Sequence, residues 1–381
     1  MLPDDPIVLR PTEWEIASGT ILGGTVSRHR PSEADPLDAL LGAITPSLMI
    51  SPCVVSFSGG RDSSIILAAA THAARAAGVP DPLPVTLRFP RDSYSIEDDW
   101  QERVIEHLGL TEWRVLSFDS ELELTGPIAA KVLRKHGLLW PANAYVHEPI
   151  FEIATGGVVL TGADGDGLLG SWRWAKLADV MAGRRKRELR HSKTLARAVS
   201  PTRFKAWWDM RDPTSLPWLK EPHRSLRARE IALDQAGEPS DWRKRISWWA
   251  GRRYLEMMRS SLEAVATSHG VRVVHPFLDP GFLGAVASDG GRWGAGGRLT
   301  MNRRYFGSLL PDAVLGRTTK VVLTTALWGP RTRQIMRGWD GRDWTAQEWL
   351  DADGLRGEWA KDFPDFRTAI LLHSLRSSWM S

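Results

Sequence analysis

The sequence predicts an α/β protein in which a parallel sheet carries helices on both faces and is followed by a mostly α-helical region. Strand-like and helix-like segments alternate from residue 54 to about residue 162. This alternation is typical of parallel strands joined by crossover helices. From residue 186 to 381 the alternation is lost, and helical patterns are interrupted at SPTRF, RDPTSLPWLKEP and GEPSDW.

The 381 residues divide into three predicted parts: an N-terminal cap at 1–45, an α/β domain at 46–185 and a helical domain at 186–381. A hydrophobic content of 43% supports a substantial core. No run approaches the roughly 20 apolar residues of a membrane span, and the N-terminus lacks a secretion or transit signal. We therefore expect a soluble, cytoplasmic protein. The single cysteine, Cys53, excludes an internal disulfide and any multi-cysteine metal site.

The elements of the α/β domain are predicted from short apolar runs and helical spacing. Strands are expected at 54–57, 83–89, 112–118 and 157–162. Helices are expected at 62–77, 98–109 and near 147–156, with a further helical pattern in ELTGPIAAKVLRKHG. Ligands of parallel sheets bind beyond the carboxyl ends of the strands. The loops that follow the first and fourth strands are therefore the candidate binding loops.

The first candidate loop lies in VVSFSGGRDSSIILA at residues 54–68. Gly59 and Gly60 allow a close backbone approach, and the next helix directs its unpaired N–H groups and positive dipole end at the loop. Such a loop binds phosphate. It lacks the GK[ST] ending of a Walker A loop, which disfavours an ordinary P-loop NTPase. Asp62 would repel a phosphate unless a cation lay between them, and Mg²⁺ meets that need.

The second candidate loop is LTGADGDGLLGSW at residues 160–172. Its glycines surround two carboxylates, Asp164 and Asp166, directly after the fourth predicted strand. Because the carboxyl ends of parallel strands meet at one edge of a sheet, this loop is expected beside the first. Asp62 and Asp166 could then hold one Mg²⁺ against a triphosphate.

The two loops resemble the SGGxDSS and LSGEGxDExxGGY motifs of the asparagine synthetase family, in its C-terminal synthetase domain. This domain is an ATP pyrophosphatase related to β-lactam synthetases and lasso-peptide cyclases. The segment PFLD at 276–279 resembles a third motif of the family, and Lys320 falls on a lysine that follows an arginine. The resemblance covers roughly residues 50 to 330. It implies an adenine nucleotide α-hydrolase-like fold that cleaves ATP between the α and β phosphates.

The resemblance also implies which residues bind ATP and Mg²⁺. Asp62 and Asp166 fall on the two aspartates that share the metal, and Lys320 falls on the lysine that meets the pyrophosphate; these three are the expected catalytic residues. The residues expected to bind the nucleotide are Ser58, Gly59, Gly60, Asp62, Ser63, Ser64, Leu87, Arg88 and Gly162. Leu87 and Arg88 fall where a strand backbone lines the adenine pocket. The role of Arg298 is left open, because its alignment needs a gap.

Several positions depart from the family pattern. Ala163 stands where the family often carries glutamate, or tyrosine in the β-lactam branch, and Gly167 replaces another acidic residue. Val274 replaces an arginine. Alanine cannot accept a proton, so Asp164, Glu148 or a residue of the helical half would have to serve as the base, unless the amine enters neutral.

We expect an ATP-dependent carbon–nitrogen ligase that adenylates a carboxylate, releases pyrophosphate and transfers the acyl group to an amine. The sequence has no room for the family's N-terminal glutaminase domain, so the amine is expected from the substrate, from solution or from a separate protein. This favours natural-product biosynthesis, such as lasso-type macrolactam formation. The expected partners are a small-molecule or peptide acid and amine, with a precursor peptide or partner protein as a further possibility.

Two alternatives stay open. The basic stretch 184–253 suggests an ATP-dependent tRNA-modifying enzyme with the same type of loop. The PFLD and LTG motifs fit the amide-forming branch better, and no cysteine pair is present for sulfur delivery, so nucleic acid is disfavoured. Ala163 suggests a non-catalytic nucleotide-binding subunit as the other alternative.

Overall fold

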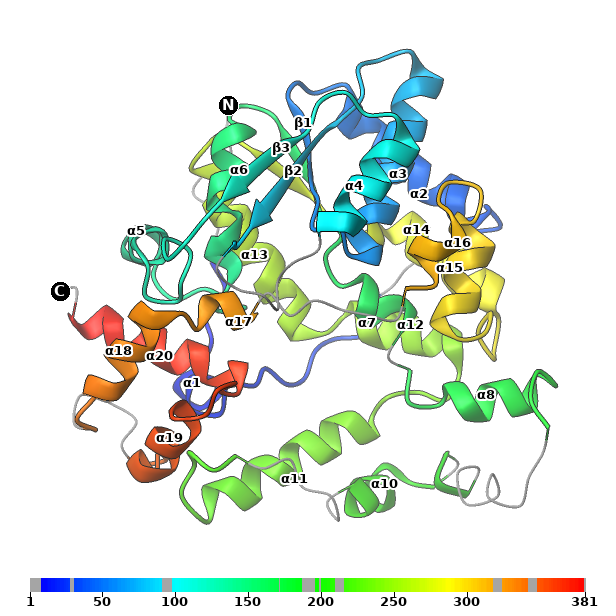
Figure 1. Ribbon diagram of the computed structural model, residues 1–381. Helices are drawn as coiled ribbons and strands as arrows, with labels where there is room; N and C mark the ends of the chain where they lie inside the picture. Colours follow the sequence, from blue (N-terminus) through cyan, green and yellow to red (C-terminus); the bar gives the residue numbers. More distant parts are fainter. Residues whose placement is uncertain are drawn as a thin grey trace.

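The computed structural model describes residues 8–27, 31–90, 98–170, 172–186, 196–198, 200–209, 216–317, 324–341 and 348–379. Within this part of the chain, five parallel strands form one sheet in the order β3-β2-β1-β4-β5 (Figure 1). The strands are β1 (Cys53–Ser56), β2 (Leu83–Arg88), β3 (Arg114–Ser117), β4 (Val158–Leu160) and β5 (Arg272–Val274). The predicted parallel α/β architecture is confirmed.

The fifth strand comes from the region predicted to be helical. β5 pairs with β4 in parallel, with Val273 opposite Val159. A strand of three residues is too short to show the two-residue periodicity by which strands are recognised in a sequence. The helical half of the chain therefore completes the sheet that the first half begins.

The sheet separates two hydrophobic cores. Val54 and Val159 belong to one core, whereas their neighbours Val55 and Leu160 belong to the other, as expected when alternate side chains point to opposite faces. The first core is covered by helices that include α5 (Pro127–His136), α6 (Glu148–Ile153), α13 (Arg253–Thr267) and α20 (Ala369–Trp379). The second is covered by helices that include α2 (Pro36–Leu48), α3 (Arg61–Ala77), α4 (Asp98–Leu108) and α14 (Pro280–Gly290).

The remaining helices surround this layered centre, and α10 and α11 lie side by side as an arm below it (Figure 1). They are α1 (Glu13–Ser18), α7 (Gly165–Leu169), α8 (Ala175–Met181), α10 (Thr202–Asp209), α11 (His223–Ala236), α12 (Trp242–Ala250), α15 (Arg298–Phe306), α16 (Asp312–Leu315), α17 (Thr324–Leu327), α18 (Pro330–Gly338) and α19 (Ala352–Trp359). Short 3₁₀ helices are η1 (Ala144–His147), η2 (Pro276–Leu278) and η3 (Phe366–Thr368). None of the described helices has the length and apolar character that a membrane span requires.

The strand order predicts a ligand-binding crevice between β1 and β4, at the carboxyl ends of these strands. The chain passes from β1 to β2 on one side and reaches β4 on the other, so the crossovers after β1 and β4 leave the sheet in opposite directions. A crevice forms at the carboxyl ends of the strands where such a reversal occurs. Both predicted loops begin at this crevice.

Candidate active site

The phosphate loop connects β1 to α3 and is held by its own serines. Gly59 has a φ of 81°, in the left-handed region that favours glycine. Ser63 donates from Oγ to the Gly60 carbonyl at 3.0 Å and accepts from the Ser58 N–H at 3.2 Å. Ser64 also donates to the Gly60 carbonyl, at 2.8 Å. No side chain caps the start of α3, so its first N–H groups are left for a ligand.

The loop after β4 packs directly on the phosphate loop. A Cβ atom on Gly162 would lie 2.7 Å from the Ser63 backbone nitrogen, and one on Gly165 would lie 2.6 Å from Cγ of Asp62. The atoms in the way at Gly162 are backbone atoms, so glycine is required there for the two loops to meet, whereas a side chain at Gly165 would displace the Asp62 carboxylate. Asp164 lies between these glycines with a φ of 57°, an uncommon conformation for a residue with a side chain.

Arg298, at the start of α15, touches both predicted metal ligands. Its Nη2 lies 2.5 Å from Oδ1 of Asp62, and its Nη1 contacts Oδ1 of Asp166. A single guanidinium reaches both carboxylates, so the two side chains lie within reach of one cation. Asp62 and Asp166, which are 104 positions apart in the sequence, thus lie on either side of the Arg298 guanidinium.

The donor set fits Mg²⁺. Mg²⁺ in nucleotide sites is usually held by one or two carboxylates together with phosphate oxygens and water, rather than by a full protein cage. Asp62 and Asp166 supply two such carboxylates next to the phosphate loop. In the described part of the chain, no group of three or more His, Cys, Asp or Glu side chains converges on a metal position.

Two further arginines lie at the phosphate loop and were not singled out from the sequence. Arg61 lines the same cavity as the two aspartates. Burial lowers the pKa of its guanidinium, and the positive charges of Arg298 and Arg317 lower it further. Arg317 is buried and donates from Nη1 to the Gly59 carbonyl at 3.2 Å. Positive charges gathered in this way are suited to an anionic ligand.

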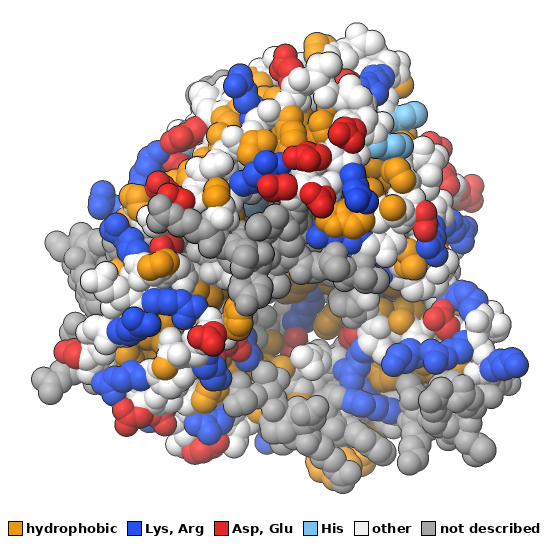
Figure 2. Space-filling model, in the orientation of Figure 1, with side chains coloured by type: hydrophobic (Ala, Val, Ile, Leu, Met, Phe, Trp, Pro, Cys, Tyr) orange, Lys and Arg blue, Asp and Glu red, His pale blue; other side chains and the backbone are white. Residues whose placement is uncertain are grey.

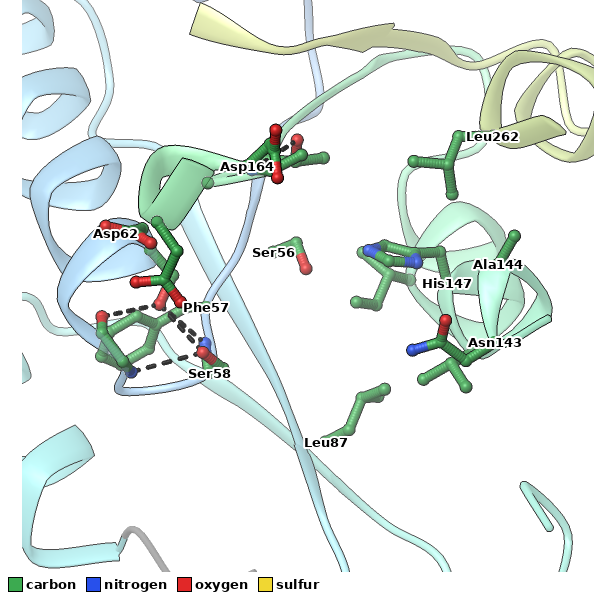
Figure 3. A pocket seen from close by; sticks show the side chains of 18 of the residues that line it. Ser56, Phe57, Ser58, Asp62, Leu87, Asn143, Ala144, His147, Asp164 and Leu262 are labelled. Carbon is green, nitrogen blue, oxygen red and sulfur yellow. Dashed lines mark hydrogen bonds between the residues drawn. The ribbon is translucent and has the colours of Figure 1, made fainter. Parts of the chain in front are cut away.

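A cavity of about 480 Å³ extends from the two loops to a wall formed by η1, α6 and α13 (Figure 3). The predicted site residues that line it are Ser58, Gly60, Asp62, Ser63, Leu87, Gly162 and Asp166. Gly59 belongs to the phosphate loop and Ser64 is fully buried behind it. The Arg88 side chain turns toward α4, where its Nε lies 3.0 Å from Asp98 and from Gln101. Lys320 lies outside the described residues.

The two residues named as possible bases lie in different places. Asp164 lines the cavity, where it accepts a hydrogen bond of 2.9 Å from the Tyr254 hydroxyl. Burial raises the pKa of Asp164 to about 6. Glu148 lies away from the cavity lining and pairs with Lys131 at 2.8 Å and His269 at 3.0 Å. Of these two carboxylates, only Asp164 faces the site.

The PFLD segment contributes to packing and capping. Phe277 is buried against Phe282 and Phe306. Asp279 caps α14 by accepting hydrogen bonds from the N–H groups of Gly281 at 2.8 Å and Phe282 at 3.2 Å. None of its four residues is in the cavity lining within the described part of the chain. In this structure the segment therefore stabilises the fold and does not form the cavity wall.

Comparison with known families identifies the chain. The sequence matches the family model described as asparagine synthase over residues 49–362. The comparison with curated proteins gives no match. The matched span includes both aspartate loops, the PFLD segment and Arg298. The chain therefore belongs to the asparagine synthase family, a family of ATP-dependent ligases that form amide bonds.

Proposed function

We propose that this protein uses ATP to adenylate a carboxylate, releases pyrophosphate, and then joins the acyl group to an amine. The observation that carries this proposal is the contact of one guanidinium, that of Arg298, with both Asp62 and Asp166 beside the phosphate loop. A cation position shared by two carboxylates at the N-terminus of a helix suits a metal-bound triphosphate. The proposed reaction class is that of the family, and the proposed residue roles are argued from the positions of the residues in the site.

Each residue at the loop has a proposed role in the first step. The N–H groups at the start of α3 and the hydroxyl of Ser58 would hold phosphate oxygens, and the Ser63 hydroxyl would do so after turning away from the Gly60 carbonyl. Arg61 and Arg298 would place positive charge beside the departing pyrophosphate. Mg²⁺ held by Asp62 and Asp166 would supply further neutralisation of the phosphate charge. Lys320 is proposed as another cation at this position, from its place in the family motif.

The proposed chemistry has two displacements. A carboxylate oxygen of the acid attacks the α phosphorus, and the bond to the oxygen that bridges to the β phosphate breaks. The amine nitrogen then attacks the acyl carbon, AMP leaves with the bonding electrons, and the proton of the amine passes to a base or to solvent. Holding acid and nucleotide side by side supplies effective molarities of about 10⁵ M or more in well-oriented reactions.

For the substrate, we propose a peptide or peptide-like acid and amine of specialised metabolism, as in macrolactam formation. Two observations support this choice. Ala163 lacks the acidic or phenolic side chain that relatives often place at this position, which separates the site from ordinary asparagine synthesis. Figure 2 shows a hollow between the sheet-bearing half and the α10–α11 arm, with Lys and Arg side chains inside it. Such a hollow would suit a substrate larger than an amino acid.

The test is to incubate the purified protein with ATP, Mg²⁺ and candidate acids, and to follow pyrophosphate, phosphate and AMP. We expect pyrophosphate and AMP in equal amounts, with an amide product in the mass spectrum when an amine or a precursor peptide is added. Release of phosphate and ADP would contradict adenylation. A product formed on tRNA would support the tRNA alternative, and no turnover with any substrate would support the non-catalytic alternative.

A further inference from the structure

The loop that carries Asp166 contains α7, a helix of only five residues whose position depends on its neighbours. Asp166 is the second residue of this helix. An isolated helix shorter than about 12–15 residues is marginal in water, so tertiary packing decides where α7 lies. The neighbouring helix α12 lies beside it (Figure 1). Side chains of α12 can therefore fix the position of the Asp166 loop.

Arg245, on α12, binds the backbone of α7 directly. Its Nη2 donates to the carbonyl oxygen of Gly167, and its Nη1 donates to that of Leu168. The last carbonyl groups of a helix have no N–H partner within the helix, and a charged donor makes stronger hydrogen bonds to them than a neutral one. One guanidinium thus holds the end of α7 that follows Asp166.

The Arg245 side chain is itself held in place. Its exposed fraction is 1%, and its Nε lies 3.5 Å from Oε1 of Glu238. The rings of Trp242 and Trp249 lie beside the guanidinium, with their centres 5.2 and 5.9 Å from its carbon atom. Side chains in close-packed interiors of this kind occupy defined rotamers. Arg245 is therefore a rigid support for the short helix.

The packing of α12 on α7 leaves no room for a side chain at Gly167. A Cβ atom there would lie 2.7 Å from Nε1 of Trp249 and 2.6 Å from Oδ2 of Asp164. Trp249 is buried and has little room to move away. Glycine, which has no Cβ, lets the backbone of α7 come this close to α12. The glycine that departs from the family pattern and the arginine that binds its carbonyl therefore belong to one contact.

Glu238 connects Arg245 to the end of α11, which it follows in the chain. The segment after α7 is bound to the same turn. The backbone N–H of Arg173 donates to Oε2 of Glu238 at 3.4 Å, and its Nη1 donates to the Gln235 carbonyl at 2.7 Å. The end of α11 thus holds both Arg245 and the chain that leaves α7.

We propose that Arg245 is a positioning residue for the metal site, which keeps the Asp166 carboxylate beside that of Asp62 by holding α7. The inference rests on the proposed metal role of the two aspartates. Arg245 is not among the described residues that line the cavity, so it would act only through the backbone of α7. Residues that orient metal ligands in this way typically change metal affinity by about 10- to 100-fold.

The experiment uses the double variant Arg245→Met/Glu238→Gln, which removes the guanidinium without leaving its buried partner charged and unpaired. Electron paramagnetic resonance of free Mn²⁺, as a probe for Mg²⁺, should show affinity reduced by about 10- to 100-fold in the nucleotide-free protein. In the metal-free protein, the N–H groups of α7 should exchange with deuterium faster than in the wild type. Arg245→Lys keeps one charged donor and should lie between the two, which also provides the test if the double variant does not fold.

Glu238→Gln alone is the matched control, because it removes the ion pair and leaves the guanidinium bonded to α7. We expect it to leave Mn²⁺ affinity and the exchange of α7 unchanged. An equal loss in this control and in the double variant would assign the effect to the ion pair and overturn the proposal. A folded double variant with wild-type exchange and Mn²⁺ affinity would also overturn it.

Asp166→Asn separates this inference from the proposed function. If Asp166→Asn loses Mn²⁺ affinity but the double variant does not, positioning by Arg245 is wrong and the metal role of the two aspartates stands. If Asp166→Asn binds Mn²⁺ as tightly as the wild type, the metal role of Asp166 fails, and the inference fails with it.

Discussion

Nη2 of Arg298 lies 2.5 Å from Oδ1 of Asp62, although the two residues are 236 positions apart in the chain. The same guanidinium contacts Asp166. The carboxylates of Asp62 and Asp166, which both contact this guanidinium, repel each other, and the positive charge of Arg298 offsets that repulsion. Arg298 and a metal ion thus have the same two partners. When the metal is bound, we expect Arg298 to move toward the phosphates.

Replacing Arg298 with glutamine tests this relationship. Because the guanidinium would no longer compete for the carboxylates, the nucleotide-free variant should bind Mn²⁺, as a probe for Mg²⁺, more tightly than the wild type. Electron paramagnetic resonance of free Mn²⁺ measures this directly. The kcat/KM for ATP should fall by about 10²-fold, because a positive charge beside the leaving pyrophosphate is lost.

Arg303→Gln is the matched control for that variant. Arg303 lies on the same helix, α15, but is exposed and pairs with Asp312 on the surface. We expect it to change neither Mn²⁺ binding nor kcat/KM. Equal Mn²⁺ affinity in Arg298→Gln and the wild type would show that the guanidinium and the metal do not compete.

Asp62→Asn and Asp166→Asn test the shared metal site. Each variant should reduce the exchange of pyrophosphate into ATP by about 10²-fold or more, because the neutral amide holds the cation poorly. The double variant should be little worse than either single variant, since residues that act as one unit are not additive. Losses that multiply would instead indicate two independent roles. Asp312→Asn provides a surface control.

The sequence predicted the centre of the fold well because the motifs there are local. The strand, loop and helix around Gly59 and Gly60 are encoded within 15 consecutive residues, and the structure has α3 at Arg61–Ala77, close to the predicted 62–77. The strand β5 was not anticipated, because its three residues gain their conformation from pairing with β4 rather than from a local pattern.

The site was only partly predictable for a related reason. Asp62 and Asp166 follow strands of one sheet, so topology alone places them near each other. Arg298 and Arg245 come from helices whose approach depends on tertiary packing, and no spacing in the sequence relates them to the loops. For Leu87 and Arg88 the prediction concerned the strand backbone; Leu87 lines the cavity, and the Arg88 side chain pairs with Asp98 and Gln101 on α4. The partners of a side chain such as that of Arg88 depend on tertiary packing, which no local pattern encodes.

Gly162→Ala tests the close approach of the two loops. Its new Cβ would lie 2.7 Å from the Ser63 nitrogen, so the phosphate loop would have to move. We expect nucleotide affinity to fall at least tenfold and the free energy of unfolding to drop by about 1–3 kcal/mol, as in other overpacked sites. Isothermal titration and urea unfolding measure the two effects.

Gly42→Ala is the control for the loop variant. Gly42 lies within α2, and a Cβ there would meet no atom within 4 Å. Alanine is the better helix former by about 1 kcal/mol, so this variant should be slightly more stable and bind nucleotide normally. If Gly162→Ala also bound nucleotide normally, the close contact between the loops would not matter for the site.

His275 makes stability sensitive to acid. Its Nδ1 lies 2.7 Å from the Thr161 hydroxyl, and burial, together with the positive charge of Arg259, lowers the pKa of His275 to about 3. The unfolded chain takes up this proton near pH 6.5, so the stabilising contribution is complete above that pH and is lost as the pH falls toward 3. By pH 5 the loss of unfolding free energy from this one residue should be at most about 2 kcal/mol.

His275→Asn tests this acid sensitivity. Asparagine can keep a hydrogen bond to Thr161 without titrating, so the urea midpoint of the variant should fall less between pH 7 and pH 5 than that of the wild type. Parallel pH profiles for the two proteins would show that His275 is protonated as easily in the folded state as in the unfolded one.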